Sequence, residues 1–142
     1  MSLVKTYNVK DNVVVVGARE ITGFAEEDAF EIKPLGEGIQ ISVGCYGDVG
    51  RSIDPNECYE VTLKLLGTSA DNDYLSTLYL ADNKTGKGMV PIVIRDLNGT
   101  TTFSAAQCWV ANRTTVSRGV KIKENQWTLH TGPATNFVGG NN

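Results

Sequence analysis

The sequence predicts a mainly β protein, an antiparallel β-sandwich or barrel that carries one amphipathic α-helix. Apolar and polar residues alternate strictly over Ile39–Val43 and over residues 59–65, as strands with one buried face require. Residues 69–83 depart from this period of two, because their apolar side chains return at helical spacing. A chain of 142 residues suits one core, so we expect a single domain over residues 13–142 after an arm of residues 1–12.

The remaining strands are expected where β-branched and aromatic residues lie between turn residues. In chain order they are residues 13–16, 20–24, 29–33, 90–95, 101–111 and 126–131. The pair Asn98-Gly99 is typical of a tight hairpin, so the strands on either side of it should pair with each other. These elements predict a mostly antiparallel sheet.

The predicted helix has signals at both ends. Thr68 or Ser69 suits the N-cap, and Asp71 and Asp73 lie in the first turn, where carboxylates favour the positive end of the helix dipole. Gly86 follows the expected C-terminus. We expect this helix to lie outside the sheets and to cover one face of them.

Two of the expected strands, residues 13–16 and 90–94, are apolar on both faces. A strand without a polar face needs cover on both sides, and a single helix supplies little of it. Pro91 cannot donate a ladder hydrogen bond, which indicates an edge or an irregular position. We therefore expect another subunit to supply part of the cover.

Charge and composition exclude several classes of function. The net charge of -3 and a pI near 5.1 disfavour tight binding of nucleic acid, which needs a surplus of lysine and arginine. No apolar run approaches the roughly 20 residues of a membrane span. The three cysteines have no paired spacing and follow no basic-then-apolar leader, so we expect reduced thiols in a protein made in a cytoplasm.

The sequence contains no constellation that is typical of catalysis or of metal binding. His130, the single histidine, lies in an expected strand opposite Trp127 and Leu129, and neither a nucleophile elbow nor a reactive-cysteine motif accompanies it. The cysteines, which are Cys45, Cys58 and Cys108, lack the close pair that most small zinc sites use. We therefore predict no enzymatic activity, no cofactor and no metal.

The glycine-rich segment "GCYGDVGRS", residues 44–52, invites comparison with a phosphate-binding loop. Such loops lead from a strand into the N-terminus of a helix, whereas this segment leads to another strand. We interpret residues 44–57 as an extended loop, and loops of this length in compact domains are commonly functional. Its charged residues Asp48 and Arg51 are available to pair with a neighbouring subunit.

Four further stretches occur in the order "ITGFAEEDAFEI", "YGDVGRSIDPNECYEVTLKLLGTSADNDYLSTLYLAD", "PIVIRDLNGTTTFSAAQCWVAN" and "QWTLHTGPATNFVGGN". Together they resemble the tail tube proteins of contractile-tailed bacteriophages. The resemblance runs from about residue 14 to residue 141. Its most specific parts are the Gly-Asp-x-Gly-Arg-Ser segment, the Ser-x-x-Asn-Asp-x-Leu helix start and the Asp-Leu-Asn-Gly-Thr hairpin.

The resemblance implies a small β-sandwich or barrel with one helix, six copies of which form a ring. Rings of this kind stack into a hollow tube inside a contractile sheath, and DNA leaves through the lumen without tight binding. The implied partners are further copies of the chain, the tail sheath protein, and tape measure, tail terminator and baseplate proteins, with no membrane involved. The implied location is the tail of the virion, assembled in the host cytoplasm.

The resemblance also implies two sets of assembly residues. The extended loop is expected to reach the next ring, as is the N-terminal arm, and the loop's contact residues are Gly44, Gly47, Asp48, Gly50, Arg51 and Ser52. If the strands beside the loop line the channel, the lumen-facing residues are Gln40, Ser42, Glu60, Thr62 and Lys64. Their neighbours in sequence, Ile39, Ile41, Val43, Val61, Leu63 and Leu65, should then face the core.

Two alternatives stay open. The same fold serves non-contractile tails and contractile injection or secretion particles, and the sequence of the tube subunit separates these systems poorly. The alternative of another class is a soluble β-sandwich that binds carbohydrate, with Trp109, Trp127 and the tyrosines as stacking platforms.

Overall fold

The computed structural model describes residues 4–141, and over this range the chain forms ten strands and one α-helix. The strands are β1 (Asn12–Val16), β2 (Arg19–Ile21), β3 (Phe30–Pro34), β4 (Ile39–Val43), β5 (Val49–Ile53), β6 (Tyr59–Leu66), β7 (Val90–Asp96), β8 (Thr102–Asn112), β9 (Glu124–Thr131) and β10 (Ala134–Phe137). The helix α1 spans Asp71–Thr85, and a 3-10 turn, η1, spans Val9–Asp11. The mainly β fold class with a single helix is confirmed.

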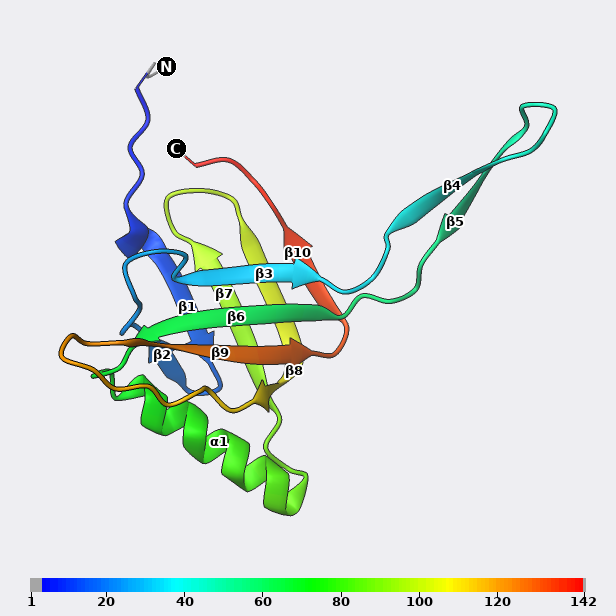
Figure 1. Cartoon of the computed structure of the whole chain (residues 1–142). Coiled ribbons are helices and arrows are strands. Elements are labelled where there is room, and N and C mark those ends of the chain that lie inside the picture. The colour runs from blue at the N-terminus through cyan, green and yellow to red at the C-terminus, as the bar shows by residue number, and fades with distance from the viewer. Residues whose placement is uncertain (1–3, 142) are drawn as a thin grey trace.

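Eight strands form one antiparallel sheet in the order β2-β1-β7-β8-β9-β6-β3, and β10 joins it by pairing with β8. Along one edge, β8 pairs with β7, whereas along the other edge β10 pairs with its first half and β9 with its second half. Register shifts between Val90 and Ile92 and between Val110 and Asn112 mark bulges, which bend strands. In Figure 1, β3, β6 and β9 cross over β1, β7 and β8, so this one sheet supplies both layers of a sandwich.

The core lies between these layers. Its buried side chains include Val14, Val16, Val61, Leu63, Leu65, Ile92, Ile94, Phe103, Trp127 and Leu129. The rings of Tyr59 and Phe103 meet edge to face, with centroids 5.3 Å apart. The prediction that the apolar positions of residues 61–65 face the core is confirmed.

Helix α1 lies along one side of the sandwich, below it in Figure 1, and adds Leu75 to the core. It begins at Asp71, two residues after the predicted start, and the Oγ of Ser69 accepts a hydrogen bond from the backbone N–H of Asp71 at 3.1 Å. Gly86, directly after the last helical residue, has a left-handed φ of 70°. The predicted end signal is therefore confirmed.

A buried carboxylate, whose partners the sequence did not indicate, fixes the start of the helix. Asp71 is only 3% exposed and accepts hydrogen bonds from Arg19 Nε at 2.7 Å and from the backbone N–H groups of Thr22 and Gly23, both at 3.0 Å. Burial acts to raise the pKa of Asp71, but the bonds from Arg19, Gly23 and Thr22 outweigh it, so the pKa lies below its usual value. Asp71 thus ties the segment after β2 to α1.

Asn72, the next residue, holds the helix against β9. Its Oδ1 accepts hydrogen bonds from Trp127 Nε1 at 2.9 Å and from Asn125 Nδ2 at 3.1 Å. Its Nδ2 donates to the carbonyl oxygens of Leu66 at 2.9 Å and Ser69 at 3.0 Å. The single polar atom of the buried indole is therefore satisfied, as a buried tryptophan requires.

Two strands, β5 and β10, differ from the sequence prediction. Residues 49–53 were expected within an extended loop, but they form β5, so that expectation is wrong for this stretch. Gly50 and Arg51 interrupt the apolar pattern that marks a strand, although the backbone still pairs. β10 is a four-residue strand that follows Gly132 and Pro133, both of which are turn residues.

Candidate functional site

Strands β4 and β5 form a separate two-stranded sheet, and within the described residues they pair only with each other. Their register runs from Ile39 opposite Ile53 to Val43 opposite Val49. Figure 1 shows the hairpin projecting from the body beyond β3 and β6, and every residue of both strands is exposed. We call residues 36–57 the hairpin arm. Two strands alone are at best marginally stable in water, so a partner surface would stabilise this arm.

The two faces of the hairpin arm differ in polarity. One face presents Ile39, Ile41, Val43, Val49 and Ile53 together with Arg51, and the other presents Gln40, Ser42, Gly50 and Ser52. The five apolar side chains are between 59% and 71% exposed. The expectation that the apolar residues of β4 face the core is therefore wrong, because the arm leaves the body and no part of residues 4–141 covers that face. Contiguous exposed apolar surface of this kind commonly marks an interaction site.

The segment "GCYGDVGRS" forms the tip of the arm and its returning strand. At the tip, the N–H of Gly44 donates to the carbonyl oxygen of Asp48 at 2.8 Å, and the N–H of Gly47 donates to that of Gly44 at 2.9 Å. Gly47 has a φ of 91°, a conformation that favours glycine. The predicted contact residues Gly44, Gly47 and Asp48 lie in this tip, Arg51 lies on the apolar face, and Gly50 and Ser52 lie on the polar face.

Asp54 closes the base of the arm. Its carboxylate accepts hydrogen bonds from the N–H groups of Glu37 at 2.8 Å and Asn56 at 3.0 Å, and its own N–H donates to the carbonyl oxygen of Gly38 at 2.8 Å. The bonds from Glu37 and Asn56 hold the pKa of Asp54 below its usual value. The bonds that Asp54 makes with Glu37 and Gly38 join the two chain segments at the base of the arm, whereas its bond with Asn56 is local.

The second predicted surface is the polar outer face of β6. Glu60, Thr62 and Lys64 are half-buried there and alternate with core residues. Their cross-strand neighbours on β3 and β9 are Glu31, Lys33, Gln126, Thr128 and His130. Gln40 and Ser42 lie on the hairpin arm, in a different sheet, so the five residues expected to line a lumen do not form one surface.

The charges on this sheet face are mixed. Carboxylates lie at Asp28, Glu31, Glu60 and Glu124, and ammonium groups lie at Lys33 and Lys64. Lys64 Nζ lies 3.9 Å from Asp28 Oδ2, and because Asp28 is exposed and the distance is long, this pair contributes little to stability. The face has a small acidic surplus and no strong field of one sign.

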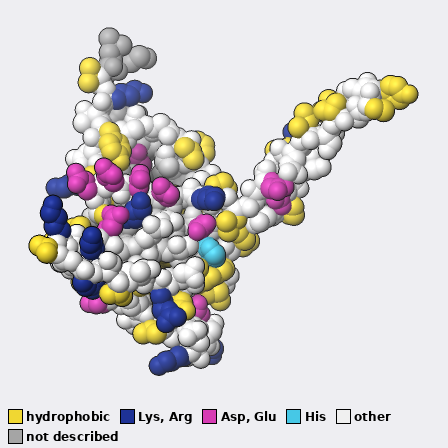
Figure 2. Space-filling model, viewed as in Figure 1, with side chains coloured by type: hydrophobic (Ala, Val, Ile, Leu, Met, Phe, Trp, Pro, Cys, Tyr) yellow, Lys and Arg dark blue, Asp and Glu magenta, His cyan; other side chains and the backbone are white. Residues whose placement is uncertain are grey.

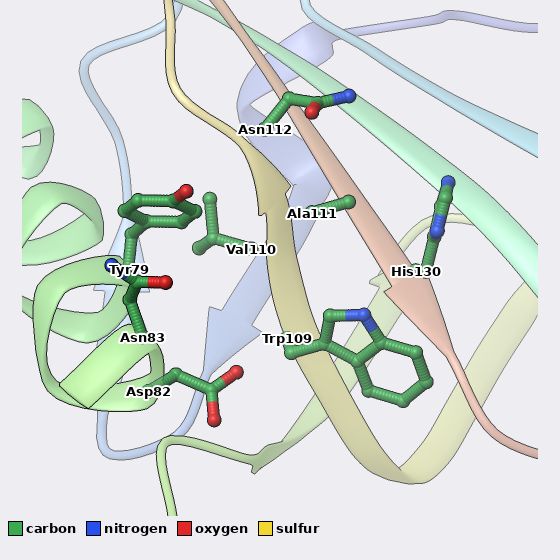
Figure 3. A pocket seen from close by; sticks show the side chains of 8 residues that line it. All are labelled: Tyr79, Asp82, Asn83, Trp109, Val110, Ala111, Asn112 and His130. Carbon is green, nitrogen blue, oxygen red and sulfur yellow. The ribbon is translucent and has the colours of Figure 1, made fainter. Parts of the chain in front are cut away.

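An open hollow of about 500 Å³ lies between α1 and the strands β8 and β9. Figure 3 shows Tyr79, Asp82 and Asn83 of the helix on one side, and Trp109, Val110, Ala111, Asn112 and His130 of the strands on the other. The carbohydrate alternative needs exposed aromatic rings. Trp109 lines this hollow. Trp127 is only 2% exposed and donates a hydrogen bond to Asn72, so Trp127 is not a stacking platform.

The three cysteines are free thiols: Cys45 is exposed at the tip of the arm, Cys58 is half-buried and Cys108 is buried. Burial raises the pKa of the Cys108 thiol to about 12. Within residues 4–141, no group of three or more His, Cys, Asp or Glu side chains is placed to hold a metal ion. In the same range, no helix has the length and apolar character needed to cross a membrane.

The fold of this chain is similar to the folds of two solved terminator proteins from contractile injection systems. The anti-feeding prophage cap, the AFP tube terminating cap, superposes with a TM-score of 0.60 and 12% sequence identity, over 96% of this chain and 94% of the cap chain. The sheath/tube terminator of PVC, an extracellular contractile injection system, in its extended state superposes with a TM-score of 0.61 and 14% identity, over 96% of this chain and 100% of the terminator chain. At these identities the likeness shows a common fold alone. No model of a known protein family matches the chain, nor does any curated protein sequence.

Proposed function

We propose that this chain is a structural subunit of a contractile-tail-like particle, in which copies of it form a ring and the rings stack into an inner tube. The observation that carries the proposal is the apolar face of the hairpin arm, with five aliphatic side chains at least 59% exposed on an element that projects from the body. Covering apolar surface of this kind with another protein surface is favourable, because it removes the apolar side chains from water. The fold shared with tube terminators of two contractile systems supports the same class of assembly.

The resemblance of the sequence to tail tube proteins supports the finer parts of the proposal. These are a ring of six copies, a lumen through which DNA passes, assembly in a host cytoplasm, and contacts with sheath, tape measure, terminator and baseplate proteins. The net charge of -3 supports a conduit that does not retain DNA, because tight binding needs cationic surface. The sheet face with Glu60, Thr62 and Lys64 is the proposed channel wall, whereas Gln40 and Ser42 belong to the arm.

A terminator ring is the second candidate, and the two superposed structures favour it, since both are terminators. As a terminator, the chain would also form a ring, but that ring would end the stack. A tube subunit presents complementary surfaces on both ends of its ring and therefore stacks without limit. The two candidates thus differ in whether the purified chain stacks by itself.

Negative-stain electron microscopy of the purified chain over a concentration series tests both candidates. Hollow tubes of variable length support the tube subunit, and single rings that never stack support the terminator. A monodisperse monomer at the highest concentration would contradict ring formation. Duplex DNA should bind weakly at physiological salt, and tight binding that falls steeply with salt would contradict the inert channel.

A further inference from the structure

The connection between β8 and β9 is a basic loop with apolar residues exposed along it. Residues 113–123, which we call the basic loop, contain Arg113, Arg118, Lys121 and Lys123 and no acidic residue, in a chain whose net charge is -3. Three aliphatic side chains project from the loop: Val120 is fully exposed, Val116 is 73% exposed and Ile122 is 64% exposed. In Figure 2, several Lys and Arg side chains gather at the edge of the body away from the hairpin arm.

The basic loop borders two hollows. One, of about 190 Å³, lies between Gly67 and Thr68 and the loop's Val120 and Ile122. The other, of about 400 Å³, lies between the loop's Val116 and the start of α1. The loop therefore offers concave, partly apolar surface beside its positive charges.

The hairpin arm has the complementary properties. Its residues 36–57 contain four carboxylates and one cation. Asp48 lies at the tip, Glu37, Asp54 and Glu57 lie toward the base, and the cation, Arg51, lies on the apolar face. Its apolar face is uncovered, and Figure 1 places it on the opposite side of the body from the β8–β9 connection. Within one copy, the arm and the basic loop thus point away from each other. Two copies arranged head to tail bring them together.

We propose that the basic loop is the receiving surface for the hairpin arm of a second copy of this chain. The aliphatic side chains of the arm pack on Val116, Val120 and Ile122 and in the adjoining hollows, while the loop's cations pair with the carboxylates of the arm. This inference rests on the proposed self-assembly and names the two surfaces that meet in it. Such a contact is heterologous, so it repeats from copy to copy, as rings and stacks require.

The exposed aliphatic side chains of the basic loop favour a protein partner over DNA. Phosphates would pair with the four cations, but they offer nothing to cover three largely exposed aliphatic side chains. The arm offers both an apolar face and an acidic surplus. Opposite charges at the rim of such a contact select the partner and accelerate association, and the covered apolar surface supplies most of the affinity.

Cross-linking with a short bismaleimide tests the contact, because Cys45 already lies exposed at the tip of the arm. All proteins in this test carry Cys58→Ser, because Cys58 is a free and only half-buried thiol, whereas Cys108 is buried. In this background the parent chain provides the arm thiol, and the variant with Cys45→Ser and Val120→Cys provides the loop thiol. We expect covalent dimers when the two proteins are mixed at assembling concentration, and none above background with either protein alone. The matched control is Cys45→Ser with Val138→Cys, since Val138 is 77% exposed near the C-terminus.

Charge reversal provides the second measurement. Lys121→Glu should raise the concentration needed for assembly by roughly two- to fivefold, the effect of one exposed ion pair, and adding Asp48→Lys should restore much of the loss. If the chain assembles but the loop thiol gives no more dimer than the Val138→Cys control, the receiving surface is wrong while the proposed function stands. If the combined charge variants assemble worse than Lys121→Glu alone, the pairing of arm and loop is also wrong. A chain that stays monomeric and never cross-links would overturn the proposed function as well.

Discussion

The substitution Ile41→Thr separates an assembly role of the hairpin arm from a folding role. Ile41 lies in the middle of β4 on the apolar face and is 70% exposed. Threonine is also β-branched, so it keeps the strand preference while a hydroxyl takes the place of the ethyl group of isoleucine. In the isolated subunit the change should alter the free energy of unfolding by less than about 0.5 kcal/mol, as exposed substitutions usually do.

The expected effect on assembly follows from the surface that remains to be covered. Full burial of an isoleucine side chain contributes about 2 to 3 kcal/mol, and 70% of the Ile41 surface is still exposed in the single copy. Covering that surface in a subunit contact is therefore worth about 1.5 to 2 kcal/mol, most of which threonine loses. One such loss weakens each contact roughly tenfold or more. Because every copy carries the change, the critical concentration for rings or tubes should rise by at least about tenfold.

Sedimentation velocity over a concentration series measures the assembly, and thermal unfolding followed by circular dichroism measures the subunit. The matched control is Ser42→Thr, which places the same residue next in sequence on the polar face of β4. It should leave both measurements unchanged. Equal assembly of Ile41→Thr and wild type would refute the idea that a neighbour covers the apolar face. A large loss of thermal stability in the Ile41→Thr monomer would refute the idea that the arm is uncovered in a single copy.

Three further predictions concern the body of the subunit. Asp71→Asn should lower the free energy of unfolding by about 2 to 3 kcal/mol at pH 7. Because the pKa of folded Asp71 is depressed, the wild type should lose this extra stability as the pH falls below about 4. The stability of the variant, measured by urea titration, should depend less steeply on acid pH. Asn72→Ala leaves the Trp127 Nε1–H without its partner and should cost about 1 to 3 kcal/mol in the same assay, while Asn83→Ala on the exposed surface of α1 should change little. Maleimide at pH 7.5 should modify Cys45 rapidly and Cys108 only upon unfolding, because Cys108 is buried and its pKa of about 12 keeps it in the thiol form; rapid labelling of both by mass spectrometry would contradict this burial.

The period of the sequence predicted most strands, because alternation reports directly which side chains share a face. It did not report what covers that face. Strands β4 and β6 have the same alternation, yet the apolar side of β6 is fully buried and that of β4 is exposed. The difference arises from pairing: β6 lies between β3 and β9, whereas β4 pairs only with β5. No local pattern carries that information.

The predicted site was incomplete for the same reason. Grouping Gln40 and Ser42 with Glu60, Thr62 and Lys64 assumed that the two alternating strands are neighbours, and the structure places them in different sheets. The ladder of β4 with β5 has a weaker signal in the sequence, because Val49 and Ile53 match the apolar positions of residues 39–43 but Arg51 interrupts them. The anchoring role of Asp71 had no sequence signal, because its partners lie about 50 residues away.

Two features of the fold support the proposed contact with a neighbour. The strands predicted to be apolar on both faces, β1 and β7, keep Val13 and Val15 partly exposed and Val93 37% exposed on their outer side. The hairpin arm exposes its apolar face more fully and has only its own two strands for support. Covering the outer side of β1 and β7 buries further apolar surface on strands that are already ordered by packing. Covering the arm also offsets the conformational entropy that is lost when the arm becomes ordered. The proposed assembly therefore predicts that ordering of the arm is coupled to it. Hydrogen exchange of the β4 and β5 amides should be fast in a dilute monomer and slow in the assembled state, while the amides of β6 and β9 should be protected in both.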